Sequence, residues 1–361
     1  MRALEVLREG ARNHGAGTSR ALTSLIVFIF VAGILGTIAT RMVVGVSQEA
    51  ANYQTAGASV YRVDLPGRID SQACDQISHM PGVLAAGASR QATDLTFALL
   101  RGLPIAVSEV TPGFIQLVGA EQNDPTSQGI ILDVDLADSL GLVALPAALA
   151  VVGKPDPVPV LGTYLSPDDG RDTALSSGAL AISNHGVYDA CWVRYIPPID
   201  NPMKVMGLAL LPEKFGGEDQ VIAPVQWNTS LGATLDPGQA FANLPLGWLI
   251  AAGGVLGIVL GAILTRLRKL EMSSALHAGA DRWSLTSISA VEVFIWLGPA
   301  VGLLLGGLVW GAHYANPDPY WPAWQAGARV IAASAAGWLV GVCAVTVLTK
   351  EQRLIKYFQQ R

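Results

Sequence analysis

The residues of this chain that could support chemistry are few and scattered. Asp133, Asp135 and Asp138 are spaced like cation ligands, but the segment lacks the glycine and the terminal glutamate of a calcium loop. Helix capping is therefore the better interpretation of these aspartates. Gly153–Lys154 lacks the rest of a phosphate-binding loop, and neither a nucleophile elbow nor a zinc-protease motif is present. We expect no enzyme activity and no cofactor bound by this chain.

Three cysteines are present, and two of them could pair. Cys343 lies in an apolar stretch, whereas Cys74 and Cys191 lie in the polar central region. An oxidising compartment would permit a disulfide between the latter two, but two separate buried thiols fit the sequence equally well. Asn228–Ser230 matches a glycosylation sequon, a pattern short enough to occur by chance.

Four stretches without any charged residue are the most informative feature of the chain. They lie between Arg20 and Arg41, Asp236 and Arg266, Glu292 and Asp318, and Arg329 and Lys350. Each reaches the roughly 20 apolar residues that a membrane-spanning helix needs. The composition agrees, because 51% of the residues are hydrophobic and only 14% are charged. A retained anchor is favoured over a signal peptide for the first stretch, because no small-residue cleavage site follows it.

The charges predict how these spans are oriented. The two terminal segments and the loop at 266–288 carry twelve basic and five acidic residues, whereas the segment 47–243 carries nine basic and 21 acidic residues. The positive-inside rule therefore places both termini in the cytoplasm and the large segment outside. The expected fold is a membrane protein with four transmembrane α-helices in a 1 + 3 arrangement and a mixed α/β extracytoplasmic domain between the first and second. The expected boundaries are a cytoplasmic amphipathic helix (1–20), spans at 21–46, 244–265, 292–314 and 329–349, the outside domain (47–243), a cytoplasmic loop (266–291), an external loop (315–328) and a cytoplasmic tail (350–361).

The outside domain is predicted to contain both strands and helices. Asp70 can cap a helix that runs to Met80, and Asp133 or Asp135 can open another that stops at Gly141. Strands are predicted at Val60–Leu65, Pro104–Val110, Gly129–Leu132, Val158–Leu165, Ala179–Ser183, Trp192–Ile196 and Val205–Leu211.

Glycines recur at every fourth residue in the last three spans. Such rows let helix backbones approach closely in lipid, so we interpret them as helix-packing faces, against either the same chain or a second copy. They are Gly253, Gly257 and Gly261, then Gly298, Gly302 and Gly306, then Gly337 and Gly341. Ionisable residues are rare in the spans, and Glu292 and His313 are expected at the two ends of the third. This pattern disfavours a proton-driven transporter and assigns the energy source to a partner.

The loop between the second and third spans is the most distinctive local segment. A helix can run to about His277 and stop at Gly279, and Asp281 can cap the helix that follows. A helical hairpin in the cytoplasm would offer a contact for another protein, although a plain connector is the alternative.

This loop resembles the cytoplasmic loop of MacB/FtsX-type (type VII) ABC transporter permeases, and the resemblance implies that its residues couple the chain to an ATPase subunit. The resemblance is carried by Glu271, Leu276, Ala278, Gly279, Ala280 and Arg282, with Asp281 between the last two and a departure at His277. Val110–Leu117, Ile130–Leu142 and Pro81–Val83 resemble stretches of the MacB-type periplasmic core, and the size of the segment is nearer to MacB than to FtsX.

The resemblance implies a permease subunit that acts by mechanotransmission, in export or in extraction of a substrate at the outer membrane face. It implies a homodimer with two copies of a separate ABC ATP-binding subunit, which would hold ATP and Mg²⁺. An external lipoprotein, adaptor or hydrolase is a further partner to expect. The alternatives are an FtsX-like regulator of a cell-wall hydrolase and a component that senses or resists peptide antibiotics.

Overall fold

The computed structural model describes the chain except for residues 1–11, 13–19, 123–128, 213–221 and 350–361. The amphipathic helix expected over residues 1–20 therefore falls almost wholly outside the described residues. The chain divides into two compact units. One is Met1–Glu49 with Gly238–Arg361, and the other is Ala50–Pro237.

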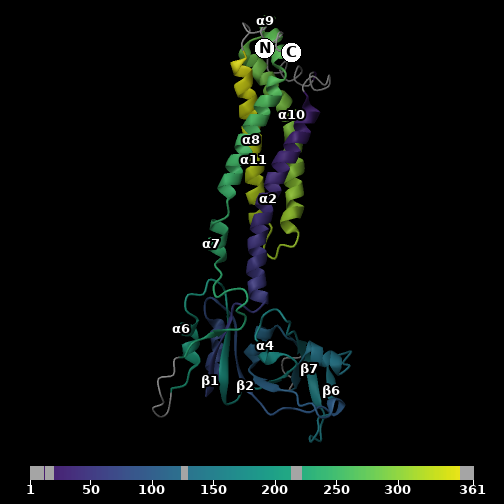
Figure 1. Ribbon diagram of the computed structural model, residues 1–361, viewed down its shortest axis with the longest axis vertical. Coiled ribbons are helices and arrows are strands. Elements are labelled where there is room, and N and C mark those ends of the chain that lie inside the picture. Colours follow the sequence, from purple (N-terminus) through teal and green to yellow (C-terminus); the bar gives the residue numbers. More distant parts are fainter. Residues whose placement is uncertain (1–11, 13–19, 123–128, 213–221, 350–361) are drawn as a thin grey trace. The chain divides into compact units, whose positions relative to one another are not determined.

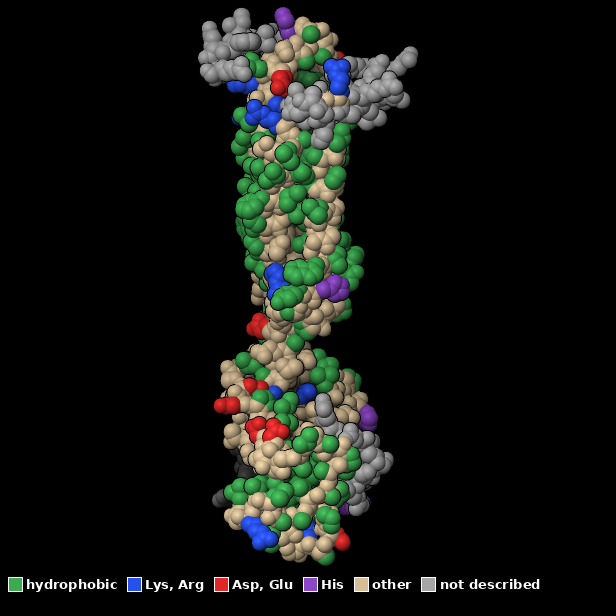
Figure 2. Space-filling model, turned by 90° about the vertical axis from the view of Figure 1, so that its right-hand side faces the viewer, with side chains coloured by type: hydrophobic (Ala, Val, Ile, Leu, Met, Phe, Trp, Pro, Cys, Tyr) green, Lys and Arg blue, Asp and Glu red, His purple; other side chains and the backbone are tan. Residues whose placement is uncertain are grey.

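The first unit is helical, and four of its helices are long and apolar enough to cross a membrane. They run side by side in Figure 1, and Figure 2 shows hydrophobic side chains over their surface with charged side chains near the ends. The helices of this unit are α2 (Ala21–Thr55, which from Ala50 onward belongs to the second unit), α7 (Pro237–Ala242), α8 (Leu246–Arg266), α9 (Lys269–His277), α10 (Arg282–His313) and α11 (Trp321–Leu348).

Glycines hold α8 and α11 in close contact. A Cβ atom built on Gly261 would lie 2.5 Å from the Trp338 carbonyl oxygen, and one on Gly253 would lie 2.7 Å from Ser334 Oγ. Side chains on Gly257, Gly337 or Gly341 would overlap the backbone of the facing helix. By contrast, Gly298, Gly302 and Gly306 of α10 have no described atom within 4 Å of the same position.

We expect Gly337→Ala to destabilise this helical unit by about 1–3 kcal/mol, because the added methyl group would meet the Gly254 backbone. The matched control is Gly45→Ala in α2, where no described atom lies within 4 Å of the new methyl group. Thermal unfolding in detergent should show a lower midpoint for Gly337→Ala and no loss for Gly45→Ala. Equal midpoints would contradict close packing at Gly337.

Three aromatic rings fill the helical core. Phe28 of α2, Trp296 of α10 and Trp338 of α11 contact one another edge to face, with ring centroids 5.3–6.0 Å apart. Phe28 and Trp338 are almost fully buried. Edge-to-face geometry suits the charge distribution of aromatic rings, so this cluster links three of the long helices.

The second unit, Ala50–Pro237, is built on a sheet of parallel and antiparallel strands and is called the mixed unit below. Among the described residues the strands follow the order β10-β1-β9-β2-β3-β8-β5-β7-β4, with β6 also paired to β7. The pairs β3–β8 and β5–β7 are parallel and the others are antiparallel. The strands are β1 (Val60–Asp70), β2 (Val83–Gln91), β3 (Val107–Val110), β4 (Glu121–Gln122), β5 (Ile130–Asp133), β6 (Ala147–Leu149), β7 (Val158–Tyr164), β8 (Ala179–Ile182), β9 (Val187–Tyr195) and β10 (Val225–Gln226).

Short helices cover this sheet, and their ends follow the capping residues in the sequence. They are α3 (Ser71–Gln76), α4 (Pro112–Val118), α5 (Val134–Ser139) and α6 (Pro202–Met206), with 3₁₀ turns at Ile77–His79, Ala98–Leu100, Thr173–Leu175 and Gly207–Ala209. Asp70 accepts hydrogen bonds from the Gln72 and Ala73 amides, and Asp133 accepts one from the Asp135 amide. Capping therefore explains Asp133, and Asp135 lies in the first turn of the helix that Asp133 caps.

The turn before α4 is fixed by a partly buried aspartate, Asp75. The Thr111 hydroxyl donates to the Asp75 carboxylate and accepts a hydrogen bond from the Ala88 amide. Burial raises the pKa of Asp75, while the bonds from Thr111 and Gly113 oppose that shift. Gly113 and Gly87 lie where a Cβ atom would overlap the facing backbone, so the Thr-Pro-Gly sequence allows α4 to pack tightly on β2.

One prediction about this unit is wrong, and one strand was not predicted. Val205–Leu211 is not a strand, because Asn201 caps α6 with Pro202 at its first position and a 3₁₀ turn follows. The central strand β2 was not predicted, because its Ala- and Gly-rich sequence has low β-propensity. The helix after Asp70 ends at Gln76 as an α-helix and continues to His79 as a 3₁₀ turn.

Candidate functional site

The loop between α8 and α10 is a helical hairpin with a sharply defined turn. Gly279 has a φ of +89°, a conformation that favours glycine. Its amide donates to the Leu276 carbonyl and the Ala280 amide donates to the Ala275 carbonyl, which ends α9 in a Schellman-type motif. Asp281 then caps α10 by accepting a hydrogen bond from the Trp283 amide at 3.1 Å. The predicted stop at Gly279 and start at Asp281 are both confirmed.

The residues of the predicted coupling segment divide by exposure. Leu276 is buried against the rest of the helical unit, and Ala280 is partly buried. The exposed members are Glu271, His277, Ala278, Gly279, Asp281 and Arg282. Trp283 follows them and is 78% exposed. Sequence reasoning missed this tryptophan, although its position directly after Arg282 could have drawn attention to it. The surface of the hairpin thus carries polar side chains and one large aromatic ring.

A three-residue ion network joins this hairpin to α10. Arg268 Nη1 lies 2.5 Å from Glu292 Oε2, and Arg268 Nε lies 3.1 Å from Glu271 Oε2. The side chain of Glu271 is 57% exposed, that of Arg268 is 15% exposed and that of Glu292 is 5% exposed. Burial alone lowers the pKa of Arg268, but the bonds and charges of Glu292 and Glu271 outweigh it and raise the pKa above its usual value.

Glu292 lies inside α10, which begins at Arg282, and its side chain is buried. Its expected place at the membrane interface stays a prediction. His313 does lie in the last turn of α10, where its ring stacks on Tyr320 at 4.3 Å.

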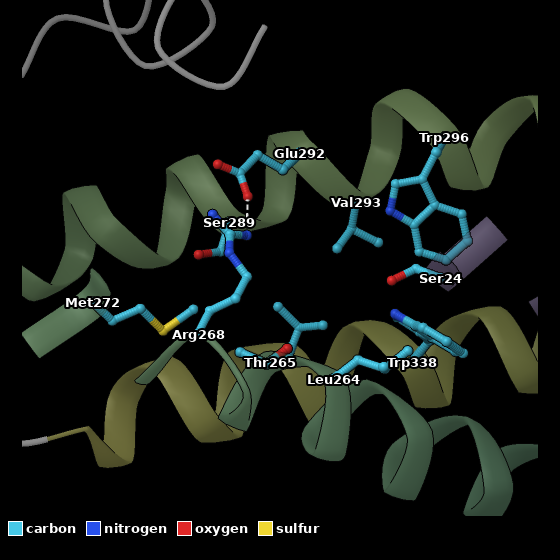
Figure 3. Close-up of a pocket in the computed structure, with 11 residues that line it drawn as sticks. Ser24, Leu264, Thr265, Arg268, Met272, Ser289, Glu292, Val293, Trp296 and Trp338 are labelled. Carbon is cyan, nitrogen blue, oxygen red and sulfur yellow. Dashed lines mark hydrogen bonds and ion pairs between the residues drawn. The ribbon is translucent and has the colours of Figure 1, made fainter. Parts of the chain in front are cut away.

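A small polar cavity adjoins the ion network. It has a volume of about 30 Å³, which is large enough for a water molecule. Figure 3 shows the charged pair at one side of it and the Trp296 and Trp338 rings at the other, with Ser24 between the rings. The lining comes from α2, α8, α9, α10 and α11, so elements from the whole helical unit meet beside Arg268 and Glu292.

The network consists of one basic and two acidic side chains on α9, on α10 and just before α9. Among the described residues, no group of three or more His, Cys, Asp or Glu side chains could hold a metal ion. A buried charged pair resists separation, because each charge would then be left in an apolar environment. The hairpin and α10 should therefore move together.

No protein-family model matches the chain, and neither does any curated protein. Solved structures with some similarity include the periplasmic region of MacB from Actinobacillus actinomycetemcomitans, with 8% identity, a TM-score of 0.32, and coverage of 44% of this chain and 84% of that one.

Two further structures are comparably distant. A domain of a permease protein from Porphyromonas gingivalis is 13% identical, with a TM-score of 0.31 and coverage of 40% of this chain and 78% of that one. The extracellular domain of the noncanonic ABC-type transporter YknZ from Gram-positive bacteria is 13% identical, with a TM-score of 0.29 and coverage of 41% and 88%. Scores this low do not establish a shared fold, so the family of this chain is a matter for proposal.

Proposed function

We propose that this chain is the permease subunit of a type VII ABC system, nearer to MacB than to FtsX. The observation that carries the proposal is the exposed hairpin at Glu271–Arg282, which has the residues of the family's coupling loop and is joined at its base to α10 by the Arg268–Glu292 pair. A partner that pushes on such a hairpin would move a long apolar helix. The nucleotide would then be hydrolysed by a separate ABC ATP-binding subunit.

The proposed topology places α2, α8, α10 and α11 in the cytoplasmic membrane. The basic residues at 266–288 support a cytoplasmic hairpin, and the acidic segment 47–243 supports an outside domain. The disulfide between Cys74 and Cys191 also fits an oxidising compartment. We further propose that the system works as a homodimer with two ATP-binding subunits, and acts in export or extraction at the outer membrane face.

The α10 glycines support a second copy of the chain. Gly298, Gly302 and Gly306 lie on one face of the helix and have no described neighbour in this chain at the Cβ position. A helix face of this kind permits close packing in lipid. The rows on α8 and α11, in contrast, already contact each other.

We expect the purified chain to show no ATP hydrolysis, and to change the ATPase rate of a co-expressed ABC ATP-binding subunit from the same organism. Gly279→Val should abolish that change, because a β-branched residue strongly disfavours the left-handed conformation on which the reversal depends. The measurement is ATP turnover of the reconstituted complex. Ala278→Val is the matched control, because Ala278 is exposed and has a negative φ.

Two outcomes would count against the proposal. ATP turnover by the chain alone, in preparations free of other ATPases, would remove the need for a partner. A Gly279→Val chain that assembles and changes ATP turnover as the wild type does would show that the hairpin is a plain connector.

A further inference from the structure

The last turn of α2 is held by the mixed unit through a complete set of hydrogen bonds. The final carbonyl groups of a helix have no partner within it. Here the Gly57 amide donates to the Gln54 carbonyl and the Ala58 amide donates to the Tyr53 carbonyl, with Gly57 at a φ of +74°. This Schellman-type ending leaves the carbonyls of Thr55 and Ala56 free of backbone partners within the turn.

Arg171 binds the first of these carbonyls. Its Nη2 atom donates to the Thr55 oxygen at 2.6 Å, and its Nε and Nη2 atoms also bond the Asp169 carboxylate at 3.2 and 3.0 Å. The guanidinium lies 5.0 Å from the centre of the Trp227 ring, and the side chain is only 12% exposed. A cation at the carboxyl end of a helix is also favoured by the helix dipole.

Two amide side chains bind the next carbonyls. Asn228 Nδ2 donates to the Ala56 oxygen at 2.8 Å, and Gln226 Nε2 lies 2.6 Å from the Ala58 oxygen. Asn228 is fully buried and holds Ser230 through its own oxygen, so the sequon at this position is not a glycosylation site in the folded protein. Gln226 also bonds Tyr53 Oη and the Gly232 carbonyl.

These contacts join the segment by which the chain enters the mixed unit to the segment by which it leaves. Residues 53–58 form the end of α2, and residues 226–233 begin the segment that leads out of the unit towards α7. Tyr61 Oη adds a hydrogen bond to the Ala233 carbonyl at 2.9 Å. The chain therefore enters and leaves the mixed unit through a single hydrogen-bonded cluster.

We propose that Arg171, Gln226 and Asn228 form a clamp that fixes the last turn of α2 to the rest of the mixed unit, so that a displacement of α2 moves this unit and does not unwind the helix end. This proposal rests on the proposed function, in which α2 carries movement from the membrane to the outside domain. The three residues act as positioning residues. All three lie more than 100 residues after Thr55 in the sequence. Arg171, for example, follows Thr55 by 116 residues.

A second arginine in the same unit provides a matched control. Arg62 lies over the Trp192 ring at 5.2 Å and pairs with Asp64 and Asp172, with 22% of its side chain exposed. It thus shares the aromatic contact and the ion pairs of Arg171, but no hydrogen bond from Arg62 to α2 is present in the described structure. A difference between the two variants would isolate the bond to the helix end.

The test compares Arg171→Met and Arg62→Met in the full chain, with Cys343 replaced by serine and spin labels at Asn52 of α2 and at Asn184, which are both exposed and both belong to the mixed unit. We expect the distance distribution between the labels to broaden for Arg171→Met and to stay as narrow as wild type for Arg62→Met. Amide exchange at Gly57 and Ala58 should also accelerate at least about tenfold for Arg171→Met alone, because a hydrogen bond from a charged group is lost. Arg171→Lys, which keeps a cationic donor, should restore part of the protection.

If Arg171→Met and Arg62→Met gave the same label distances and the same amide exchange rates at Gly57 and Ala58, the clamp proposal would be rejected. If Arg171→Met fails to fold, Arg171→Gln replaces it, and the same difference from Arg62→Met is required. Neither measurement uses a partner subunit, so its result is separate from that of the ATPase experiment. An absent ATPase effect in wild type would reject the proposed function, whereas unchanged label distances and exchange would reject the clamp.

Discussion

Replacing Arg268 with methionine should strongly destabilise the helical unit and uncouple it from its partner. The substitution takes the guanidinium from Glu292, whose side chain is 5% exposed, while the carboxylate stays buried. Removing one member of a buried ion pair costs about 3–5 kcal/mol. Thermal unfolding in detergent should show this loss, and ATP turnover of the reconstituted complex should show no effect of the chain on its partner.

Two further variants separate stability from coupling. Glu271→Gln should cost at most about 1 kcal/mol, because that carboxylate is 57% exposed and screened by solvent. Arg268→Met combined with Glu292→Met should recover most of the stability, since a buried ion pair can be replaced by packed apolar side chains. It should not recover coupling, because the connection from Glu271 through Arg268 to α10 is absent. An Arg268→Met chain as stable as Glu271→Gln would contradict a buried pair.

Helix ends and the apolar helices could be predicted from the sequence because their signals are local. Asp70, Asp133 and Asp281 each cap a helix within three residues, and Gly141 and Gly279 end helices through their own positive φ angles. Long charge-free stretches identify membrane-length helices by composition alone. The positions of these features depend on neighbours in the chain and not on the fold.

The ion network beside the hairpin could not be predicted from the sequence, because it is formed by residues that are far apart in the chain. Arg268 and Glu292 are separated by 24 residues, so neither one marks the other as a partner. Strand β2 lies between β9 and β3, and Gly87 lets α4 pack closely on it, but both facts depend on partners that its own sequence does not reveal. Asn201 followed by Pro202 is typical of a helix start, and a helix does begin there. The apolar residues that follow this pair led to the wrong prediction of a strand.

The sequence does not decide between a disulfide and two separate thiols, because 117 residues separate Cys74 from Cys191. In the structure Cys74 of α3 is bonded to Cys191 of β9, with their Cα atoms 6.0 Å apart. Both residues are fully buried in a core with Val63, Ala88 and Val193. The bond therefore ties a covering helix to the centre of the sheet.

Replacing both Cys74 and Cys191 with alanine should destabilise the mixed unit by about 4–5 kcal/mol, because a bond that closes a loop of this length removes much of the freedom of the unfolded chain. Cys343→Ala is the matched control, and its effect on the mixed unit should be negligible, because Cys343 belongs to α11. Unfolding is followed by protease resistance of the mixed unit in the full chain. Thiol titration in denaturant without reductant should find one reactive thiol per wild-type chain and three after reduction. Three thiols before reduction would show that Cys74 and Cys191 are not bonded, and would also remove the evidence that this unit folds in an oxidising compartment.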